Sequence, residues 1–315
     1  AHDWVGDGSV QFTQLMNTMS LVIPVGERFF IDAVRHYRDQ ITDPELKKAA
    51  TAFIGQEAMH GREHDEYNAR VIERLPSAAV FEKRVKALLD WFASSTPPSM
   101  RLSTTIALEH LTAIMADGLL QEPRVSEKAE KGYAALWRWH ALEETEHKGV
   151  AYDVWEATQG KGAQAYVIRA FGLVLATSVF WAMVTPHFLN FVRQEGKLTE
   201  LKGWKSFYRM AFGEVGFLRK MARPWLDYFR PSFHPWDDDN SHFLAEVDSF
   251  TEAFRTPRAA YAAMVTRLDR EVGRLLDLLT TLGLDEQTIV VFTSDNGPLY
   301  DKLGGTDTDF FNSAA

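Results

Sequence analysis

Two E-x-x-H sequences constrain the fold of this chain more than any other feature. Glu57 and His60 form one in QEAMHGREH, and Glu144 and His147 form the other in HALEETEHKGVAYDVW. Three residues span almost one turn of an α-helix, so within each pair the carboxylate and the imidazole leave the same face. One pair alone is a weak signal, because both side chains also occur on ordinary solvated helices. Two pairs predict two helices that direct their polar groups towards a common site.

Two further glutamates interrupt apolar helical stripes. Glu27 in PVGERFF shares its stripe with Ile23, Phe30 and Val34, and Glu109 in ALEHLTA lies on a similar stripe. A charge on a core-facing stripe is costly unless it is paired or bound to a metal. A Glu from each of two helices and an E-x-x-H from each of two others form the ligand set of a di-metal site in a helical bundle. The predicted metal ligands are therefore Glu27, Glu57, His60, Glu109, Glu144 and His147.

Three more polar residues lie beside these ligands. His64 and His140 extend the two polar stripes by one turn each, and Glu143 adjoins Glu144. His64 or His140 is either an additional metal ligand or a group that orients a ligating carboxylate. We favour the orienting role, because four Glu and two His already complete a two-metal site. Glu143 points to another side of its helix, and we expect it at the surface or just outside the ligands.

The composition limits which metals and which binding partners are plausible. The chain of 315 residues contains no cysteine, which excludes thiolate ligands, disulfides and cysteine nucleophiles. Oxygen and nitrogen ligands suit iron, manganese or zinc, and two iron ions are our first expectation. The net charge of −9 argues against a nucleic-acid partner, since such a partner favours basic surfaces. No secretory signal is visible, so we expect a cytoplasmic protein, with membrane association as an alternative.

Helical patterns run through residues 10–240, and no alternating strand pattern appears before about residue 285. One or two helices are expected over residues 10–40, with a break near Pro24. Asp43 and Pro44 are typical of a helix start, and this helix continues to about Leu75. Further helices are expected over about 80–94, from the TPPS segment to about 120, and over about 126–158. These patterns predict a mainly α protein with a helical bundle in residues 1–240.

Residues 162–236 are expected to add hydrophobic and aromatic helices to the bundle. Between residues 170 and 192 there is no Asp, Glu, Lys or Arg, and a segment of this length can span a bilayer. Polar residues such as His187 and Asn190 make spanning unfavourable. We therefore favour a helix packed on the bundle or a lid over an apolar substrate tunnel, with peripheral membrane contact as the alternative. Residues 203–236 are aromatic and basic, which fits a helical subdomain with a solvated basic face or a lipid interface.

Five segments of the chain resemble a known family. PVGERFF, FIGQEAMHGREH, LEHLTA, WHALEETEHKGVAYDVW and YFRPSFHPWD are similar to the ferritin-like family of predicted metal-dependent hydrolases. The resemblance covers about residues 10–240 and implies a ferritin-like helical bundle with a di-metal site at the six predicted ligands. The family's name implies hydrolysis, whereas ferritin-like relatives more often activate dioxygen at two iron ions. The resemblance therefore leaves the reaction type open.

The tail, residues 241–315, resembles a different class of protein. The segment from TPRAAYAAMVTRL to TIVVFTSDNGP is similar to an internal, incomplete fragment of a sulfatase of the alkaline-phosphatase superfamily. Residues 257–282 have the pattern of an amphipathic helix and Ile289–Thr293 that of a buried strand, so a short α/β segment is expected. The resemblance implies a calcium site at Asp295 and Asn296. The C/S-x-P-x-R nucleophile motif is absent from the chain, so we do not expect sulfatase activity.

The leading hypothesis is a di-iron carboxylate enzyme that activates dioxygen to oxidise an apolar small molecule. The first alternative is a metal-dependent hydrolase, in which two cations lower the pKa of a bridging water. The others are a non-catalytic iron-binding protein, which would lack an apolar pocket beside the metals, and a structural membrane-associated protein. We expect a homo-oligomer. For the tail, a fusion remnant, an oligomerisation arm and a sequence combined from two sources remain alternatives.

Overall fold

The computed structural model describes residues 9–244, 272–276, 278–284, 287–288 and 290. The chain divides into two units, residues 1–244 and 245–315. Within the described residues all regular structure is helical and no strand occurs, which confirms the prediction of a mainly α protein.

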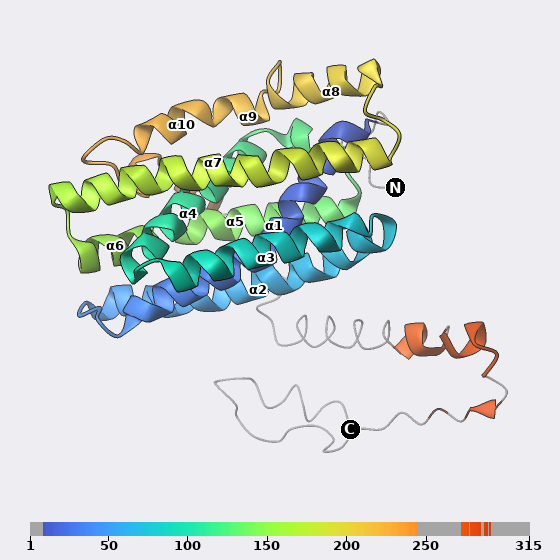
Figure 1. Ribbon diagram of the computed structural model, residues 1–315, viewed down its shortest axis with the longest axis horizontal. Helices are drawn as coiled ribbons and strands as arrows, with labels where there is room; N and C mark the ends of the chain where they lie inside the picture. The colour runs from blue at the N-terminus through green and yellow to red at the C-terminus, as the bar shows by residue number, and fades with distance from the viewer. Residues whose placement is uncertain (1–8, 245–271, 277, 285–286, 289, 291–315) are drawn as a thin grey trace. The chain divides into compact units, whose positions relative to one another are not determined.

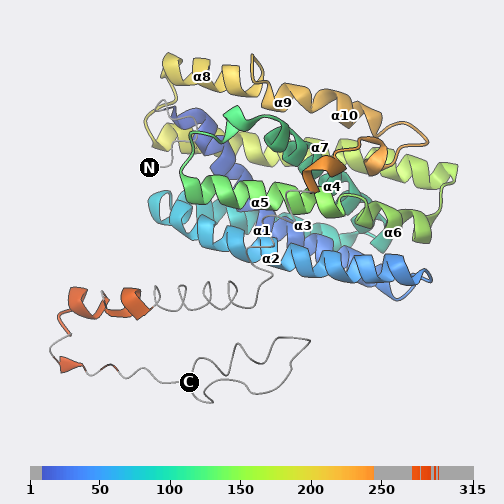
Figure 2. The ribbon, with the colours of Figure 1, turned by 180° about the vertical axis from the view of Figure 1, so that it is seen from behind.

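Four helices that carry the predicted ligands run along the long axis of the first unit (Figures 1 and 2). They are α1 (Val10–Arg38), α2 (Pro44–Arg74), α4 (Pro98–Gln121) and α5 (Lys131–His147), and α5 is followed by α6 (Val150–Gln159). The predicted start of α2 is confirmed, because the Asp43 side chain accepts a hydrogen bond from the Glu45 amide at 3.0 Å and Pro44 occupies the first helical position. These helices enclose the site described below.

Helix α1 continues through Pro24 without a break, so the alternative of two separate helices is wrong. A proline inside a helix removes one hydrogen bond, the one that its own amide would donate to the carbonyl four residues earlier. That carbonyl belongs to Ser20, and here Asn68 of α2 donates its side-chain amide to it at 3.0 Å. A neighbouring helix therefore satisfies the carbonyl that Pro24 leaves free. Helices α1 and α2 also approach closely at Gly61, where an added Cβ would lie 3.1 Å from Glu27 Oε2.

The single helix expected over about 126–158 is two helices, because the regular ladder stops at Lys148 and Gly149. The segment around 234–240 docks at this break. Lys148 donates to the Asp238 carbonyl and to Asn240 Oδ1, both at 2.6 Å. A Cβ added to Gly149 would lie 2.7 Å from Trp236 Nε1, so only glycine admits the indole here. The break follows directly after the predicted ligand His147.

The remaining helices cover the bundle. Helices α3 (Ser77–Ser95) and α7 (Ala163–Gln194) lie in the foreground of Figure 1, and α8 (Leu201–Ala211), α9 (Phe217–Lys220) and α10 (Ala222–Asp227) follow one edge. Helix α7 packs tightly on α4, since a Cβ on Gly172 would lie 2.1 Å from Ser103 Oγ. One side of α7 is therefore buried, as expected for a helix packed on the bundle, but Val167 and Phe171 on its other side are exposed. By length and composition alone, α7 is the one helix among the described residues that is long and apolar enough to cross a membrane.

Most of the predicted features of the tail lie outside the described residues. Residues 272–276 and 278–281 are helical, within the helix expected over 257–282. Of the expected strand Ile289–Thr293 only Val290 is described, and Asp295 and Asn296 are not described.

Candidate metal centre

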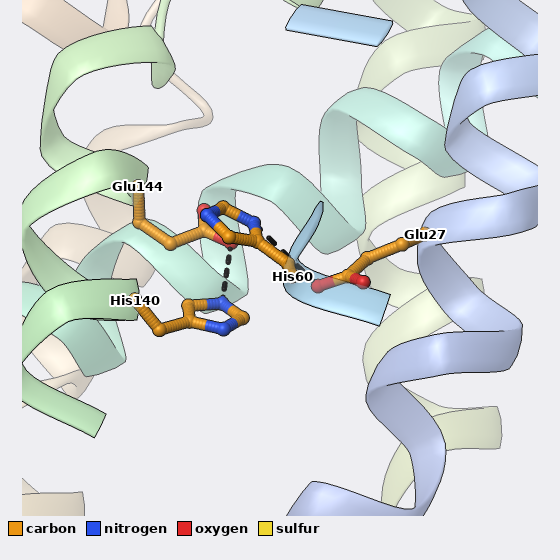
Figure 3. A group of neighbouring side chains, drawn as sticks. All are labelled: Glu27, His60, His140 and Glu144. Atoms are coloured by element: carbon orange, nitrogen blue, oxygen red, sulfur yellow. Dashed lines mark hydrogen bonds and ion pairs between the residues drawn. The ribbon is translucent and has the colours of Figure 1, made fainter. Parts of the chain in front are cut away.

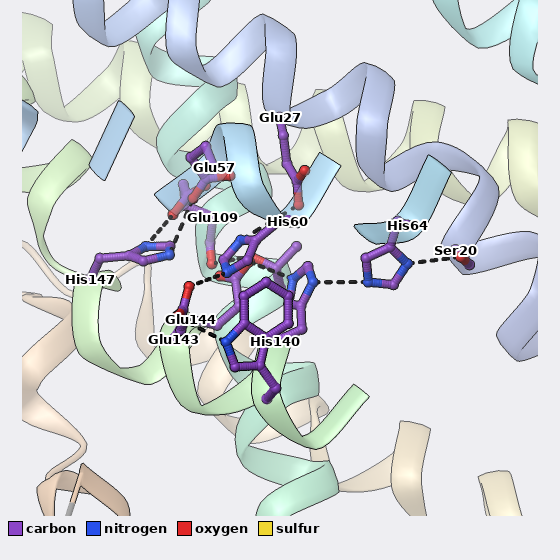
Figure 4. A network of polar contacts seen from close by, with 12 residues as sticks. Ser20, Glu27, Glu57, His60, His64, Glu109, His140, Glu143, Glu144 and His147 are labelled. Atoms are coloured by element: carbon purple, nitrogen blue, oxygen red, sulfur yellow. Dashed lines mark hydrogen bonds and ion pairs between the residues drawn. The ribbon is translucent and has the colours of Figure 1, made fainter. Parts of the chain in front are cut away.

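All six predicted ligands converge inside the bundle (Figure 4). Glu27 comes from α1, Glu57 and His60 from α2, Glu109 from α4, and Glu144 and His147 from α5. None of the six exposes more than 3 % of its surface. Four carboxylates and two imidazoles therefore share one buried site, as the helical spacing predicts.

The ligand atoms fall into two groups of metal-binding size. Glu57, His60, Glu144 and His147 offer one atom each within 4.8 Å of one another, and so do Glu27, His60, His140 and Glu144 (Figure 3). Both groups contain His60 and Glu144, so they are adjacent. Two adjacent groups of nitrogen and carboxylate ligands suit two cations bound side by side.

Many polar atoms in this site have no hydrogen-bond partner. They are both carboxylate oxygens of Glu27, Glu57 and Glu109, Nδ1 of His60, and both ring nitrogens of His147. A buried polar atom without a partner costs about 1–3 kcal/mol, and more when it is charged. Proteins tolerate such atoms where an ion satisfies them. The donor set therefore fits bound metal cations, which would coordinate these same oxygens and nitrogens.

The electrostatics of the site lead to the same conclusion. Burial and the charges of neighbouring carboxylates raise the pKa of Glu27 and of Glu57 well above the usual value. For Glu109, burial and the charge of Glu144 raise the pKa to about 7. Burial also acts on Glu144, but its hydrogen bond with His140 and the nearby imidazoles lower its pKa to about 2. Without cations, Glu144 thus loses its proton readily, whereas the three carboxyl groups around it retain theirs to higher pH.

The two histidines of the E-x-x-H pairs are held in different ways. His60 Nε2 lies 3.0 Å from Glu143 Oε2, and Trp139 donates to the other oxygen of Glu143 at 2.9 Å. When the Nε2–H of His60 donates to Glu143, the lone pair of Nδ1 points towards Glu27 Oε1, 3.6 Å away. His147 lies between two carboxylates, 3.2 Å from Glu57 and 3.7 Å from Glu109. Glu143 thus orients a predicted ligand, as a group just outside the ligand set does.

A chain of hydrogen bonds reaches the site from Asn68. The Asn68 side chain donates its NH2 group to the Ser20 carbonyl. Its Oδ1 is therefore the acceptor for the Ser20 hydroxyl, at 2.7 Å. Ser20 has no second proton, so its oxygen accepts from His64 Nδ1 at 2.8 Å. Burial and the charges of nearby histidines keep the pKa of His64 well below its usual value, so His64 is neutral and its Nε2 is an acceptor. His140 Nδ1, 3.0 Å away, must donate to it.

This chain determines what the other nitrogen of His140 can do. Because Nδ1 of His140 donates its proton to His64, Nε2 is the free position and lies 2.9 Å from Glu144 Oε1. Without a cation, Nε2 and Glu144 Oε1 form a hydrogen bond. A cation bound between them would take the place of this hydrogen bond, and Nε2 would then be a ligand. The sequence favoured His140 as an orienting group, whereas the geometry supports a ligand role for His140 and an orienting role for His64.

Sequence reasoning did not assign a role to Ser20, Asn68 or Thr112. Thr112 of α4 places its hydroxyl 3.0 Å from Glu144 Oε2 and 3.0 Å from the Glu109 carbonyl. The position of Ser20 four residues before Pro24 was a usable signal, because the freed carbonyl needs a donor. Nothing in the sequence shows that Asn68 supplies this donor, since the pairing depends on how α1 and α2 pack.

A cavity of about 320 Å³ leads to the site. Its walls come from α1, α3, α4 and α7 and are almost entirely apolar, and Glu27, His140 and Glu144 lie at its polar end. A smaller cavity of about 70 Å³ also reaches His140 and Glu144 and is lined by Met16, Met19 and Met115 among others. Helix α7 contributes Leu175, Ala176, Val179, Phe180, Met183 and Val184 to the larger one. The hydrophobic segment 170–192 thus forms a wall of an apolar space beside the predicted ligands.

Comparison with known proteins separates the chain into two parts. Residues 219–313 match the sulfatase family model. N-acetylgalactosamine-6-sulfatase of Rattus norvegicus is 33 % identical over 109 residues, which cover 31 % of this chain and 20 % of that protein. Arylsulfatase A of Homo sapiens is 37 % identical over 70 residues, covering 22 % of this chain and 13 % of that protein. The chain thus spans a fifth or less of these relatives, so the resemblance of the tail to a sulfatase fragment is confirmed and concerns a fragment only.

The rest of the chain has a different relationship. No solved structure gives a significant match. Residues 1–239, which hold the whole buried cluster, match the family model described as predicted metal-dependent hydrolase. The resemblance to the predicted metal-dependent hydrolases is thereby confirmed, and this chain belongs to that family.

Proposed function

We propose that this protein is a hydrolase that uses two bound metal cations to cleave an ester or amide of an apolar acid. Family membership supports hydrolysis. The observation that carries the metal site is the set of buried carboxylate and imidazole atoms without hydrogen-bond partners. We also propose that α1, α2, α4 and α5 form a ferritin-like bundle, because Glu27, the Glu57 pair, Glu109 and the Glu144 pair are the ligand set typical of that architecture.

The residues of the chain would divide the work as follows. Glu57, His60, Glu144 and His147 would hold one cation, and Glu27, His140 and Glu144 the other, with Glu109 beside His147. Two divalent cations lower the pKa of a bound water and polarise the substrate oxygen. Glu143 and His64 keep the imidazoles of His60 and His140 in one orientation.

The cavity supports an apolar substrate. Among its lining residues there is no Lys or Arg that would bind a phosphate or sulfate group, and most are aliphatic or aromatic. Such walls bind an uncharged chain and exclude water, so the reacting group of the substrate would lie at the end formed by Glu27, His140 and Glu144. The cavity also argues against a purely iron-storing protein, for which no apolar pocket beside the metals is expected.

The test combines metal analysis with an esterase assay. We expect about two transition-metal or zinc ions per chain and hydrolysis of p-nitrophenyl esters, with longer acyl chains preferred. Glu144→Gln should remove both the metal and the activity, because Glu144 belongs to both ligand groups. Glu146→Gln is the matched control, an exposed position on the same helix. Hydrolysis that survives Glu144→Gln and metal chelation would refute the proposal.

The second candidate is a di-iron enzyme that oxidises an apolar molecule with dioxygen. The carboxylate-rich ligand set and the nearly unbroken apolar wall of the cavity favour it. Two ferrous ions at the same residues would supply the reducing electrons for dioxygen. Oxygen consumption by the iron-loaded protein, without any ester cleavage, would select this candidate over hydrolysis. Ester cleavage by the zinc-loaded protein, without oxygen uptake by the iron form, would select the hydrolase.

A further inference from the structure

Helix α7 exposes a long apolar stripe to the outside of the bundle. Val167, Phe171, Val174 and Leu189 are 60 %, 54 %, 45 % and 38 % exposed. Ser178, Ala182 and Thr185 are exposed at helical spacing between them, and Val179 and Pro186 are exposed beside these positions; all five are uncharged. This α7 stripe (residues 167–189) is about 33 Å long at the rise of an α-helix. A soluble surface seldom leaves such a stripe without a binding partner.

The stripe is not the outer edge of a core helix. Only 28 % of the most apolar eighteen-residue window of α7 is buried. The opposite face of α7 is fixed to the bundle: Gly172 touches Ser103, and Ala176 and Val184 form cavity wall. Arg169, also on α7, is buried and donates to the carbonyls of Tyr228 and Arg230 at 2.6 and 3.0 Å. A helix anchored in this way lies along a surface and does not cross a bilayer.

The cavity opens beside the stripe. Trp91 of α3 and Val179 of α7 both line the cavity and are 62 % and 37 % exposed. They place the entrance between α3 and α7, the two helices in the foreground of Figure 1. The entrance is thus bordered by an indole and by the apolar stripe. If an apolar medium covered this entrance, an apolar molecule could pass from it into the cavity without crossing water.

Helix α8 adds an aromatic and basic border. It packs on the end of α7, with Phe188 5.9 Å from Trp204 and 5.5 Å from Phe207 between ring centroids. On its outer side Leu201 is 84 % exposed and Tyr208 63 %. Among the described residues no carboxylate pairs with its exposed Lys202 or Lys205. Aromatic rings with unpaired lysines beside an apolar stripe are the composition of a helix at a lipid interface.

We propose that the α3–α7–α8 face binds the surface of a bilayer that contains anionic lipid, and that apolar molecules pass from the bilayer into the cavity. The α7 stripe and Trp91 contact the acyl boundary, while Lys202 and Lys205 bind the headgroup charges. A second copy of the chain is the less suitable occupant, because it would leave these lysines without counter-charges and would cover the cavity entrance. Binding is measured without turnover, so this proposal and the proposed hydrolysis can fail separately.

The experiment is co-sedimentation of the full chain with vesicles of phosphatidylcholine and phosphatidylserine, and with phosphatidylcholine alone. We expect binding to the mixed vesicles. Phe171→Glu combined with Val174→Glu should lower the partition coefficient about tenfold or more, since both side chains would have to leave the lipid. The control at the same site is Phe171→Leu, which keeps an apolar side chain, and Thr51→Glu on α2 controls for the added charge. Circular dichroism verifies that all variants are equally helical.

Substitution of the two lysines tests the proposed contact with anionic headgroups independently. Lys202→Glu with Lys205→Glu should weaken binding to the mixed vesicles by about tenfold and leave binding to phosphatidylcholine alone unchanged. Equal vesicle binding by the wild type and the Phe171–Val174 variant overturns the proposal. The proposal is also overturned if the wild type does not bind vesicles and Phe171→Glu lowers its oligomeric state in solution. The face is then an interface between copies of the chain.

Discussion

At the scale of single residues, the site depends on which groups donate and which accept in the hydrogen bonds that lead to His140. Pro24 frees the Ser20 carbonyl, Asn68 binds it, and the hydroxyl of Ser20 is then left to accept from His64. Each step follows from the number of protons a group has. The result is a His140 ring whose Nδ1 is committed and whose Nε2 faces the carboxylates. Through this chain of hydrogen bonds, Pro24 in α1 determines which ring nitrogen of His140 on α5 carries the proton.

Substitution of Ser20 tests this chain. Ser20→Ala removes the acceptor of His64 Nδ1, so neither His64 nor His140 is held in one tautomer. We expect metal affinity to fall about 10- to 100-fold, as it does when the partners of metal-ligating histidines are removed. Competition with a chromophoric chelator measures it. Thr18→Ala, which removes a buried hydroxyl from the same helix that binds only the Gln14 carbonyl, should leave the affinity unchanged. Equal losses in both variants would contradict the chain.

Glu109 gives the metal-free protein a specific pH dependence. Its pKa rises from the ordinary 4.5 to about 7 on folding, through burial and the charge of Glu144. The folded chain binds this proton more tightly than the unfolded chain. Its contribution to stability is therefore complete below about pH 4.5 and is lost as the pH rises through about 7. The loss amounts to about 3 kcal/mol at most.

Glu109→Gln isolates this effect. Above pH 7 the metal-free variant should be more stable than the metal-free wild type, and the two should converge towards pH 4.5. The measurement is thermal unfolding in the presence of a chelator. Comparing the two proteins at each pH removes the opposite contribution of His60 and His64, whose pKa values are lowered by burial. A constant difference across this range would show that Glu109 does not titrate as stated.

At the scale of helices, the break between α5 and α6 holds the end of the site in place. His147 is the last residue of α5, and Lys148 and Gly149 then bind the segment around Trp236. The ring of Phe53 contacts His147 edge-on at 5.1 Å from the side of α2. The position of this predicted ligand therefore depends on a loop nearly ninety residues further along the chain.

Two glycine substitutions separate this role from helix propensity. Gly149→Ala brings a Cβ within 2.7 Å of Trp236 Nε1, and we expect a loss of about 1–3 kcal/mol in unfolding free energy. Metal affinity should fall with it because His147 shifts. Gly55→Ala on α2 meets nothing within 4 Å and should stabilise the protein by about 0.5–1 kcal/mol. Denaturant unfolding and metal titration of both variants provide the check. If Gly149→Ala left the unfolding free energy unchanged, the segment around Trp236 would not pack against Gly149 as described.

The helices show what the sequence could and could not predict. Spacing alone located Glu27, Glu109 and both E-x-x-H pairs on inward faces, because burial on a helix repeats with a fixed period. It missed the break at Gly149, since the cause is a contact with Trp236, distant in sequence. It favoured a helix packed on the bundle for residues 170–192 but did not show how much of the other side of α7 is exposed. Composition gives the polarity of a helix but not the number of its neighbours.

At the scale of the whole molecule, the cavity connects the site to the surface, and its length should select substrates. Ala176 lies on the cavity wall, so Ala176→Leu shortens the space available to an acyl chain. We expect a loss of about tenfold in kcat/KM for the longest esters, with little change for the shortest. Ala182→Leu, at an exposed position of the same helix, is the control. A uniform loss for all chain lengths would place the substrate elsewhere.

The site also makes metal loading an exchange of ions. In the metal-free protein, Glu27, Glu57 and Glu109 retain protons more readily than ordinary carboxylates. Cations that bind these atoms must displace those protons. Zinc added to the metal-free chain in weak buffer should therefore acidify the solution, and the apparent affinity should rise with pH. The acidity around the protein thus becomes a control on how much metal it holds.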